Sequence, residues 1–311
     1  MLDTTAPTPP AAAVALSKSQ VFMRRLGSFI VLWAVVLTAL FSSNRWVSNH
    51  VFLLAMVLLA AFGLAEFYGL AAKRGVGCFK HWGILGGVLL MLGTFLNLTG
   101  LLGTSGSPAR VNDFETSFII VFVLGLCLCQ FFSRSHTAGM LAIGMTLLGL
   151  MYVAWLLNFV QKINFFFFPG TAGCYYLLFF IVITKLSDTG AYACGSLIGR
   201  HKLCPRVSPG KTWEGFAGAI VASTLASLLL AHFLGQKLPG MNWIHATILG
   251  VVLGAGAVVG DLIESLFKRD AGAKDSGKFF PGIGGILDLL DSLLFNAPIM
   301  YLYLRHVLAA R

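Results

Sequence analysis

Nine apolar runs follow one another along this chain of 311 residues, and most are close to the length of a membrane-spanning helix. A helix needs about 20 consecutive, mainly apolar residues to cross the hydrocarbon core of a bilayer. The runs cover residues 26–41, 49–72, 82–103, 117–132, 137–160, 172–187, 214–235, 243–263 and 285–308. They predict an all-α polytopic membrane protein with about nine transmembrane helices, of which 117–132 is the weakest.

The composition agrees with this class. Only 11% of the residues are charged and 57% are hydrophobic, whereas soluble domains are about 25% charged. Lys and Arg outnumber Asp and Glu by 22 to 12, an excess that basic cytoplasmic loops explain and that also favours contact with anionic lipid headgroups. Because basic and aromatic residues are not interleaved outside the apolar runs, we expect no nucleic acid partner. The six cysteines form no CxxC pair, so we expect neither a disulfide framework nor a structural zinc.

We divide the chain into three regions. Residues 1–20 predict a disordered tail, 21–180 a set of N-terminal transmembrane helices, and 181–311 a C-terminal transmembrane region that carries the chemistry. Basic residues precede the first apolar run and separate the second from the third, which places the N-terminus in the cytoplasm by the positive-inside rule. With that orientation the two most charged segments, 185–214 and 261–291, both face the cytoplasm.

Acidic residues recur at helical spacing in the second of these segments. The residues that would share one helix face are Asp261, Glu264, Ser265 and Lys268, and then Asp288, Asp291 and Ser292. Carboxylates gathered in this way repel one another and lose hydration, and a divalent cation bound by their oxygens removes both costs. We predict that Asp261, Asp288 and Asp291 bind Mg²⁺, with a second cation left open. The alternative is a solvated loop whose charges only set the topology.

Glycines accompany both charged segments. Gly250, Gly254, Gly256 and Gly260 recur at a spacing that allows neighbouring membrane helices to approach closely. After Asp188, the glycines at 190, 195 and 199 predict a mobile loop.

The run from Ser208 to Thr212 resembles the end of a P-loop. Such a loop requires glycine five residues before Gly210, where this chain has Pro205. We therefore reject a P-loop and retain Lys211 and Arg200 as phosphate-binding candidates. In the second apolar run, Glu66 is expected either to line the same cavity or to pair with a cation at the helix end.

These motifs resemble the signature of the phosphatidate cytidylyltransferases, also called CDP-diacylglycerol synthases. The matching residues are Ser265-x-x-Lys268-Arg269, Lys274-Asp275, Pro281-Gly282-x-Gly284-Gly285 and Asp288-x-x-Asp291, preceded by Asp188-Thr189-Gly190-Ala191-Tyr192, Gly199-Arg200 and Ser208-Pro209-x-Lys211-Thr212. The resemblance covers residues 185–300. Three positions depart from it. Ile283 and Leu289 stand where the family usually has His and Arg, and Gly210 stands where it usually has Lys.

The resemblance implies transfer of CMP from CTP to phosphatidate, with Mg²⁺ as cofactor, at the cytoplasmic face of a bacterial inner membrane. The expected partners are CTP, phosphatidate and the membrane, with a homodimer left open. The residues that it assigns to catalysis are Asp275, Lys274, Lys268, Ser265 and Asp188. The residues that it assigns to substrate binding are Lys211, Arg200, Arg269, Ser208 and Thr212.

Three alternatives remain open on the sequence. A CTP-dependent polyprenol or phytol kinase would use the same nucleotide but release CDP. A transporter would use intramembrane carboxylates as ion ligands, although transporters often show corresponding repeats in their two halves, and charge here is confined to the C-terminal part. An inactive scaffold is the third alternative, because Ile283 and Leu289 replace the usual His and Arg.

Overall fold

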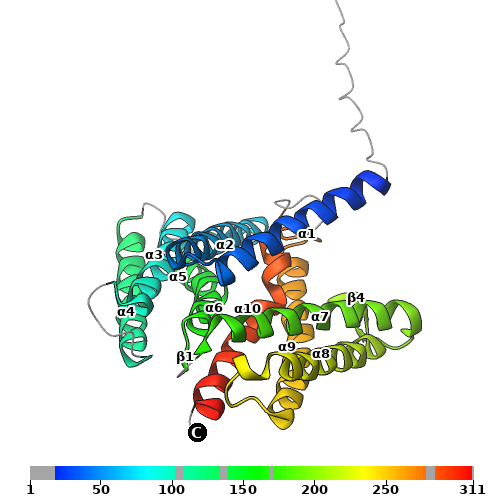
Figure 1. The fold of residues 1–311 in the computed structure, drawn as a ribbon. Coiled ribbons are helices and arrows are strands. Elements are labelled where there is room, and N and C mark those ends of the chain that lie inside the picture. The colour runs from blue at the N-terminus through cyan, green and yellow to red at the C-terminus, as the bar shows by residue number, and fades with distance from the viewer. Residues whose placement is uncertain (1–17, 102–107, 134–138, 169–170, 278–283, 310–311) are drawn as a thin grey trace, which may run out of the picture.

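The computed structural model describes residues 18–101, 108–133, 139–168, 171–277 and 284–309, and nearly all of these lie in helices (Figure 1). The first half of the chain contains α1 (Lys18–Phe41), α2 (Arg45–Lys73), α3 (Lys80–Thr99), α4 (Pro108–Phe131), α5 (Gly139–Gly149), the π-helical segment η1 (Leu150–Trp155) and α6 (Leu156–Asn164). A short antiparallel hairpin of β1 (Phe167–Phe168) and β2 (Thr171–Ala172) follows.

The second half of the chain carries nearly all of the predicted site residues. Its elements are α7 (Cys174–Ile198), β3 (Lys202–Cys204), β4 (Ser208–Thr212), α8 (Trp213–Leu234), the 3-10 segment η2 (Gly235–Lys237), α9 (Trp243–Asp270), α10 (Ile286–Tyr303) and the π-helical segment η3 (Leu304–Leu308). Strands β3 and β4 pair antiparallel, with Lys202 opposite Thr212. In Figure 1, α3, α4 and α5 lie on one side of the molecule and α7, α8 and α9 on the other, with α10 between them.

Eight helices among the described residues are long and apolar enough to cross a membrane, and α1 adds a shorter apolar stretch, Ile30–Phe41. The prediction of an all-α polytopic membrane protein is therefore confirmed. The weakest of the predicted spans is longer than its apolar run suggested, because the candidate span in α4 extends over Arg110–Phe131. The boundary drawn at residue 180 falls inside α7, so this helix is shared by the two predicted transmembrane regions.

The predicted mobile loop after Asp188 is wrong, because α7 continues through these residues to Ile198. Gly190 is a helix-packing residue instead. A Cβ atom at this position would lie 2.6 Å from the Gly218 carbonyl oxygen of α8. Since that is shorter than a van der Waals contact, only glycine lets α7 and α8 approach to this extent.

The glycines of α9 pack as their spacing predicted. Gly254 faces Ile220 and Ser223 of α8, and Gly260 faces Asp291 and Phe295 of α10. Side-chain hydrogen bonds join the same helices: the Ser223 hydroxyl donates to the Gly250 carbonyl at 2.8 Å. Close backbone approach and interhelical hydrogen bonds are the main forces between helices in a membrane, where apolar burial contributes little. Helix α9 is thus held between α8 and α10.

Candidate active site

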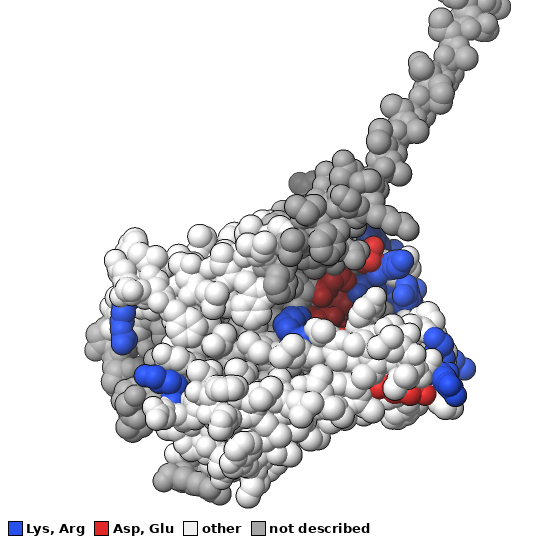
Figure 2. Space-filling model, turned by 45° about the vertical axis from the view of Figure 1, so that its right-hand side comes forward, with Lys and Arg blue, Asp and Glu red and all other residues white. Residues whose placement is uncertain are grey.

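Three carboxylates from α9 and α10 form what we call the acidic cluster: Asp261, Glu264 and Asp291. One carboxylate oxygen of each residue lies within 4.8 Å of one oxygen of each of the other two. The helical spacing of Asp261 and Glu264 puts both on the face of α9 that meets α10, and Gly260 lets the two helices touch there, because its α-carbon lies against the Asp291 backbone. Figure 2 shows one group of red carboxylates in a recess with Lys and Arg beside it, and a second red patch near further Lys and Arg at the lower right, on a face that is otherwise mostly white.

Two of the predicted phosphate-binding lysines contact this cluster. Lys211 of β4 forms an ion pair with Asp261, and Lys268, one turn beyond Glu264 on α9, forms one with that residue. Ser265 lies beside them, with its hydroxyl 3.4 Å from an Asp261 oxygen. The side chain of Glu264 is only 1% exposed, and its Oε1 atom has no hydrogen-bond partner within the described residues.

The donor set suits a hard divalent cation. Mg²⁺ is bound through carboxylate oxygens and waters in proteins, and a buried carboxylate oxygen without a partner is costly unless a cation or donor faces it. The site therefore fits Mg²⁺ through Asp261, Glu264 and Asp291. This set differs from the predicted one, which contained Asp288 in place of Glu264.

Asp288 has a different environment from the acidic cluster. Its Oδ2 atom accepts hydrogen bonds from the Gly285 amide at 2.7 Å and from the Ser276 hydroxyl at 3.0 Å, and its Oδ1 atom accepts from Lys268 at 2.7 Å. The bond to Gly285 makes Asp288 half of a capping box at the start of α10. Because all these donors already face its oxygens, Asp288 holds Ser276 and Gly285 at the start of α10.

Glu66 of α2 reaches the same place from the other half of the chain. Its Oε2 atom accepts from the Ser276 hydroxyl and from the Leu287 amide, both at 3.0 Å. The Leu287 amide is one of the first N–H groups of α10, which have no partner within the helix. Glu66 thus satisfies a helix terminus, and of the two expected roles the structure places it at the site rather than with a cation at the end of α2.

Asp188 of α7 lies on the other side of Asp291. Its Oδ2 atom accepts a hydrogen bond from the Ser292 hydroxyl at 3.1 Å, and Lys185 forms a 3.3 Å ion pair with the same atom. Lys185 also donates to Ser292 Oγ at 3.1 Å and to the Leu289 carbonyl at 3.0 Å. Sequence reasoning did not select Lys185, although its position one turn before Asp188 was a usable signal.

Tyr152 is a further residue that no motif indicated. The π-helical segment η1 places its ring 5.0 Å from Phe267 of α9, centroid to centroid, and the carboxylates of the acidic cluster act electrostatically on its hydroxyl. Irregular turns of this kind are frequent at functional sites. A π-helical turn shifts side chains off the regular helical face, so the spacing in the sequence could not reveal this placement.

The remaining predicted residues lie at the edge of the site or have structural roles. Thr212 caps α8, because its hydroxyl accepts from the Gly215 amide at 3.1 Å. Arg269 donates to the Val207 carbonyl at 3.1 Å, which ties the β3–β4 hairpin to α9. Arg200, Lys274 and Asp275 are exposed, and Ser208 is half-buried in β4. Ile283 and its neighbours Pro281 and Gly282 lie outside the described residues.

An apolar cavity of about 610 Å³ adjoins the charged site. Side chains of α1, α2, α6, α7 and α10 line it, and at one end it is bounded by Lys185, Asp188 and Thr189. Leu289, one of the departures from the family pattern, contributes its side chain to this lining. The size lies within the ordinary range of small-molecule binding cavities, about 300 to 1,000 Å³.

Comparison with known proteins relates this chain to nucleotide-using enzymes. A model of the cytidylyltransferase family matches residues 24–307. The uncharacterized protein YnbB of Escherichia coli (strain K12) is 31% identical over 288 residues, which cover 88% of this chain and 85% of that protein. A phosphatidate cytidylyltransferase of Staphylococcus saprophyticus is 34% identical over 221 residues, 68% of this chain and 80% of the relative. Another from Mycobacterium leprae is 42% identical over 149 residues, 48% of this chain and 46% of the relative.

Proposed function

Because the chain belongs to the cytidylyltransferase family and is a nucleotidyltransferase, we propose that it transfers CMP from CTP to phosphatidate and forms CDP-diacylglycerol and pyrophosphate. The observation that carries this proposal is the position of the acidic cluster. It adjoins basic side chains on one side and, through Asp188 and Lys185, an apolar cavity on the other. A reaction between a water-soluble nucleotide and a membrane lipid needs a site of both kinds.

Asp261, Glu264 and Asp291 would hold Mg²⁺ in this proposal. The carboxylates outnumber the lysines that contact them, so the cluster keeps a negative charge that a cation can balance. When bound, Mg²⁺ neutralises charge on the transferring phosphoryl group and on the leaving pyrophosphate. Asp188 is close enough to act electrostatically on Asp291 and is the candidate for a second cation.

Lys211 and Lys268 would bind the triphosphate of CTP. Each forms an ion pair with one carboxylate of the cluster, and each can turn to a phosphate oxygen once a cation balances that carboxylate. Lysine suits this exchange, because its ammonium is a compact charge on a flexible stem. Arg200, Lys274 and Asp275 are exposed and would be open to a nucleotide that arrives from the cytoplasm.

The chemical step is a direct displacement at the α-phosphorus of CTP. A phosphate oxygen of phosphatidate forms the new P–O bond, and the bond between the α-phosphorus and the bridging oxygen of pyrophosphate breaks. The nucleophile is already an anion, so the protein has little need of a general base. Its contribution is to position both phosphates and to stabilise the charge that moves to pyrophosphate.

The lipid would enter from the bilayer with its chains in the apolar cavity. Its phosphate would then lie at the end bounded by Lys185 and Asp188, next to the acidic cluster. We further propose that the protein resides in the bacterial inner membrane with this site facing the cytoplasm, where CTP is made. The excess of Lys and Arg in the loops on that side supports the orientation.

The test is a reaction of the purified protein with CTP, phosphatidate and Mg²⁺ in mixed micelles. We expect pyrophosphate and CDP-diacylglycerol in equal amounts, and no product when a chelator removes the cation. Release of CDP with a polyprenol or phytol as acceptor would overturn the proposal in favour of a lipid kinase. Absence of any nucleotide turnover in protein that remains folded would favour a scaffold or a transporter.

A further inference from the structure

Lys185 is a half-buried cation to which the proposed function assigns no role of its own. It belongs to the membrane-spanning part of α7, about three turns after the helix begins at Cys174, and its side chain is only 29% exposed. Charged side chains are expensive inside membrane-spanning segments and usually have a function there.

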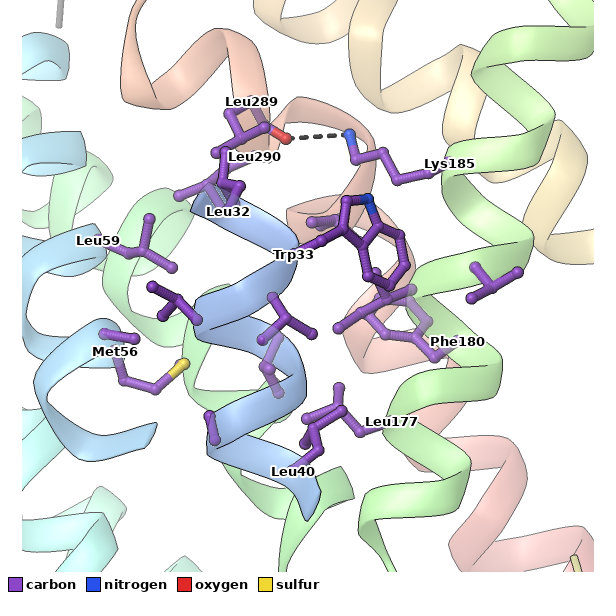
Figure 3. A pocket seen from close by; sticks show the side chains of 18 of the residues that line it. Leu32, Trp33, Leu40, Met56, Leu59, Leu177, Phe180, Lys185, Leu289 and Leu290 are labelled. Atoms are coloured by element: carbon purple, nitrogen blue, oxygen red, sulfur yellow. Dashed lines mark hydrogen bonds between the residues drawn. The ribbon is translucent and has the colours of Figure 1, made fainter. Parts of the chain in front are cut away.

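The surroundings of Lys185 differ on its two sides. On one side lies the apolar cavity, and among the described residues that line this cavity Lys185 is the only cation. On the other side lie Asp188 and, through Ser292, the acidic cluster. Figure 3 shows Lys185 at one end of the cavity, with its ammonium directed to the Leu289 carbonyl and Trp33 and Phe180 below it.

We propose that Lys185 binds the phosphate of an anionic lipid whose chains occupy this cavity, and so selects a phosphorylated lipid over a neutral one. This inference rests on the proposed function and assigns the lipid phosphate to one side chain. The class of ligand follows from the site: an apolar volume for acyl chains, with the Lys185 ammonium at a polar end that it shares with Asp188 and Thr189.

The hydrogen bonds of Lys185 allow this exchange. Its three contacts are 3.0 Å to the Leu289 carbonyl, 3.1 Å to the Ser292 hydroxyl and 3.3 Å to Asp188. A lysine has three N–H donors, so a phosphate oxygen must replace one contact, and the longest is the one to Asp188. The Ser292 hydroxyl, which donates to the same Asp188 oxygen at 3.1 Å, keeps that carboxylate bonded after the exchange.

The alternative is that Lys185 only balances the charge of Asp188. Both roles need the positive charge, but they differ in what its removal changes. A partner of Asp188 alone would affect stability or turnover, whereas a phosphate-binding residue would affect the preference for the lipid phosphate. Hydrogen bonds to charged groups contribute about 1.5 to 3 kcal/mol, which corresponds to about a tenfold to a hundredfold change in affinity.

The first experiment measures CMP transfer by Lys185→Met, which keeps the apolar stem, and by Lys185→Arg, which keeps the charge. We expect Lys185→Met to raise the KM for phosphatidate, expressed as mole fraction in micelles, at least tenfold, and to change the KM for CTP less than about twofold. Lys185→Arg should recover most of the loss. The control is Lys73→Met, which removes an exposed lysine at the end of α2 and should leave both constants unchanged.

The second experiment needs no turnover. The purified protein, without CTP, is titrated with short-chain phosphatidate, with diacylglycerol of the same chain length and with inorganic phosphate. We expect the unaltered protein to prefer phosphatidate over diacylglycerol by at least tenfold and to bind inorganic phosphate weakly, and Lys185→Met to bind the two lipids alike.

The two experiments separate the inference from the proposed function. A lipid preference that depends on Lys185 in a protein that transfers no CMP would retain the inference and refute the proposed reaction. An unchanged preference in Lys185→Met, or an equal rise in both KM values, would overturn the inference. If Lys185→Met does not fold, the Lys185→Arg protein decides: loss of the phosphatidate preference despite the retained charge would also overturn it.

Discussion

Two groups of buried or half-buried charged side chains lie in this protein, and they differ in charge balance. In the first, Glu115 of α4 and Lys162 of α6 form a 2.6 Å ion pair, with side chains only 5% and 4% exposed. Asn158 donates a hydrogen bond to the same carboxylate at 2.6 Å and another to Thr94 at 3.0 Å. In the second, the acidic cluster, two lysines contact three carboxylates, and Glu264 Oε1 has no hydrogen-bond partner within the described residues.

This difference separates a structural role from a ligand site. A buried ion pair with its hydrogen bonds satisfied requires nothing further, and here it holds α4 against α6. A partly buried cluster with surplus negative charge is unstable by itself, because desolvation and repulsion act together. A bound cation makes such a cluster favourable, so the surplus is the physical sign of a ligand site. Four substitutions test this contrast, and the second of them refines the first.

The largest effect is expected from Asp291→Asn. The change removes one carboxylate from the acidic cluster without changing the shape of the side chain, so the cation loses a ligand. Loss of several kcal/mol of charge stabilisation in the transition state corresponds to a decrease in kcat/KM of about a thousandfold or more. Thermal unfolding in detergent without Mg²⁺ should occur at the same or a higher temperature, because repulsion within the cluster decreases. A matched control is Asp113→Asn, which changes an exposed aspartate of α4.

Asp288→Asn refines this result. Because the Asp288 oxygens accept from Gly285, Ser276 and Lys268, we expect a smaller decrease in kcat/KM and an unchanged Mg²⁺ concentration at half-maximal rate. Glu264→Gln is the comparison, because it removes a proposed ligand and should raise the Mg²⁺ concentration at half-maximal rate. An equally large rise in Asp288→Asn would favour the ligand set that the sequence predicted, with Asp288 in place of Glu264.

The second largest effect is expected at the balanced ion pair of Glu115 and Lys162. Glu115→Gln leaves the Lys162 ammonium buried without its counter-charge, and breaking a buried pair in this way costs about 3 kcal/mol of unfolding free energy. The unfolding temperature in detergent should decrease, while kcat/KM of the folded protein stays close to its original value. The double change Glu115→Gln with Lys162→Met should recover most of the stability. A large loss of kcat/KM in folded Glu115→Gln protein would contradict the structural role.

The smallest effect is expected from Gly260→Ala. The added Cβ atom would lie 2.6 Å from the Asp291 carbonyl oxygen and 2.9 Å from Phe295 Cβ. Helices α9 and α10 must then separate, which moves Asp261 away from Asp291 and weakens the cation site. We expect a decrease in kcat/KM of about tenfold, partly recovered at higher Mg²⁺ concentration. Gly144→Ala on α5 is the control, since nothing lies within 4 Å of a Cβ atom there; an equal decrease in both proteins would refute the packing argument.

The sequence by itself determined the class of the protein and predicted several of the charged residues that the structure brings together. Apolar runs of membrane-spanning length predict helices with little dependence on the rest of the chain, because the backbone must satisfy its hydrogen bonds within each span. The spacing of Asp261, Glu264 and Ser265 on one helix, and of Asp288 and Asp291 on the next, is likewise a local property. The same local reasoning misjudged Gly190, where glycine indicates close helix packing rather than a loop.

Only the tertiary structure decided which partners these side chains contact. Glu66 lies 221 positions before Leu287 and accepts a hydrogen bond from its amide. No spacing rule in the sequence connects the two residues. Glu264 takes the place of Asp288 in the acidic cluster because Ser276 and Gly285 donate hydrogen bonds to Asp288. Lys185 acquires its place between an apolar cavity and Asp188 only when α1, α7 and α10 pack together. Local periodicity fixes which face a residue occupies, but the partner across that face depends on contacts between distant segments.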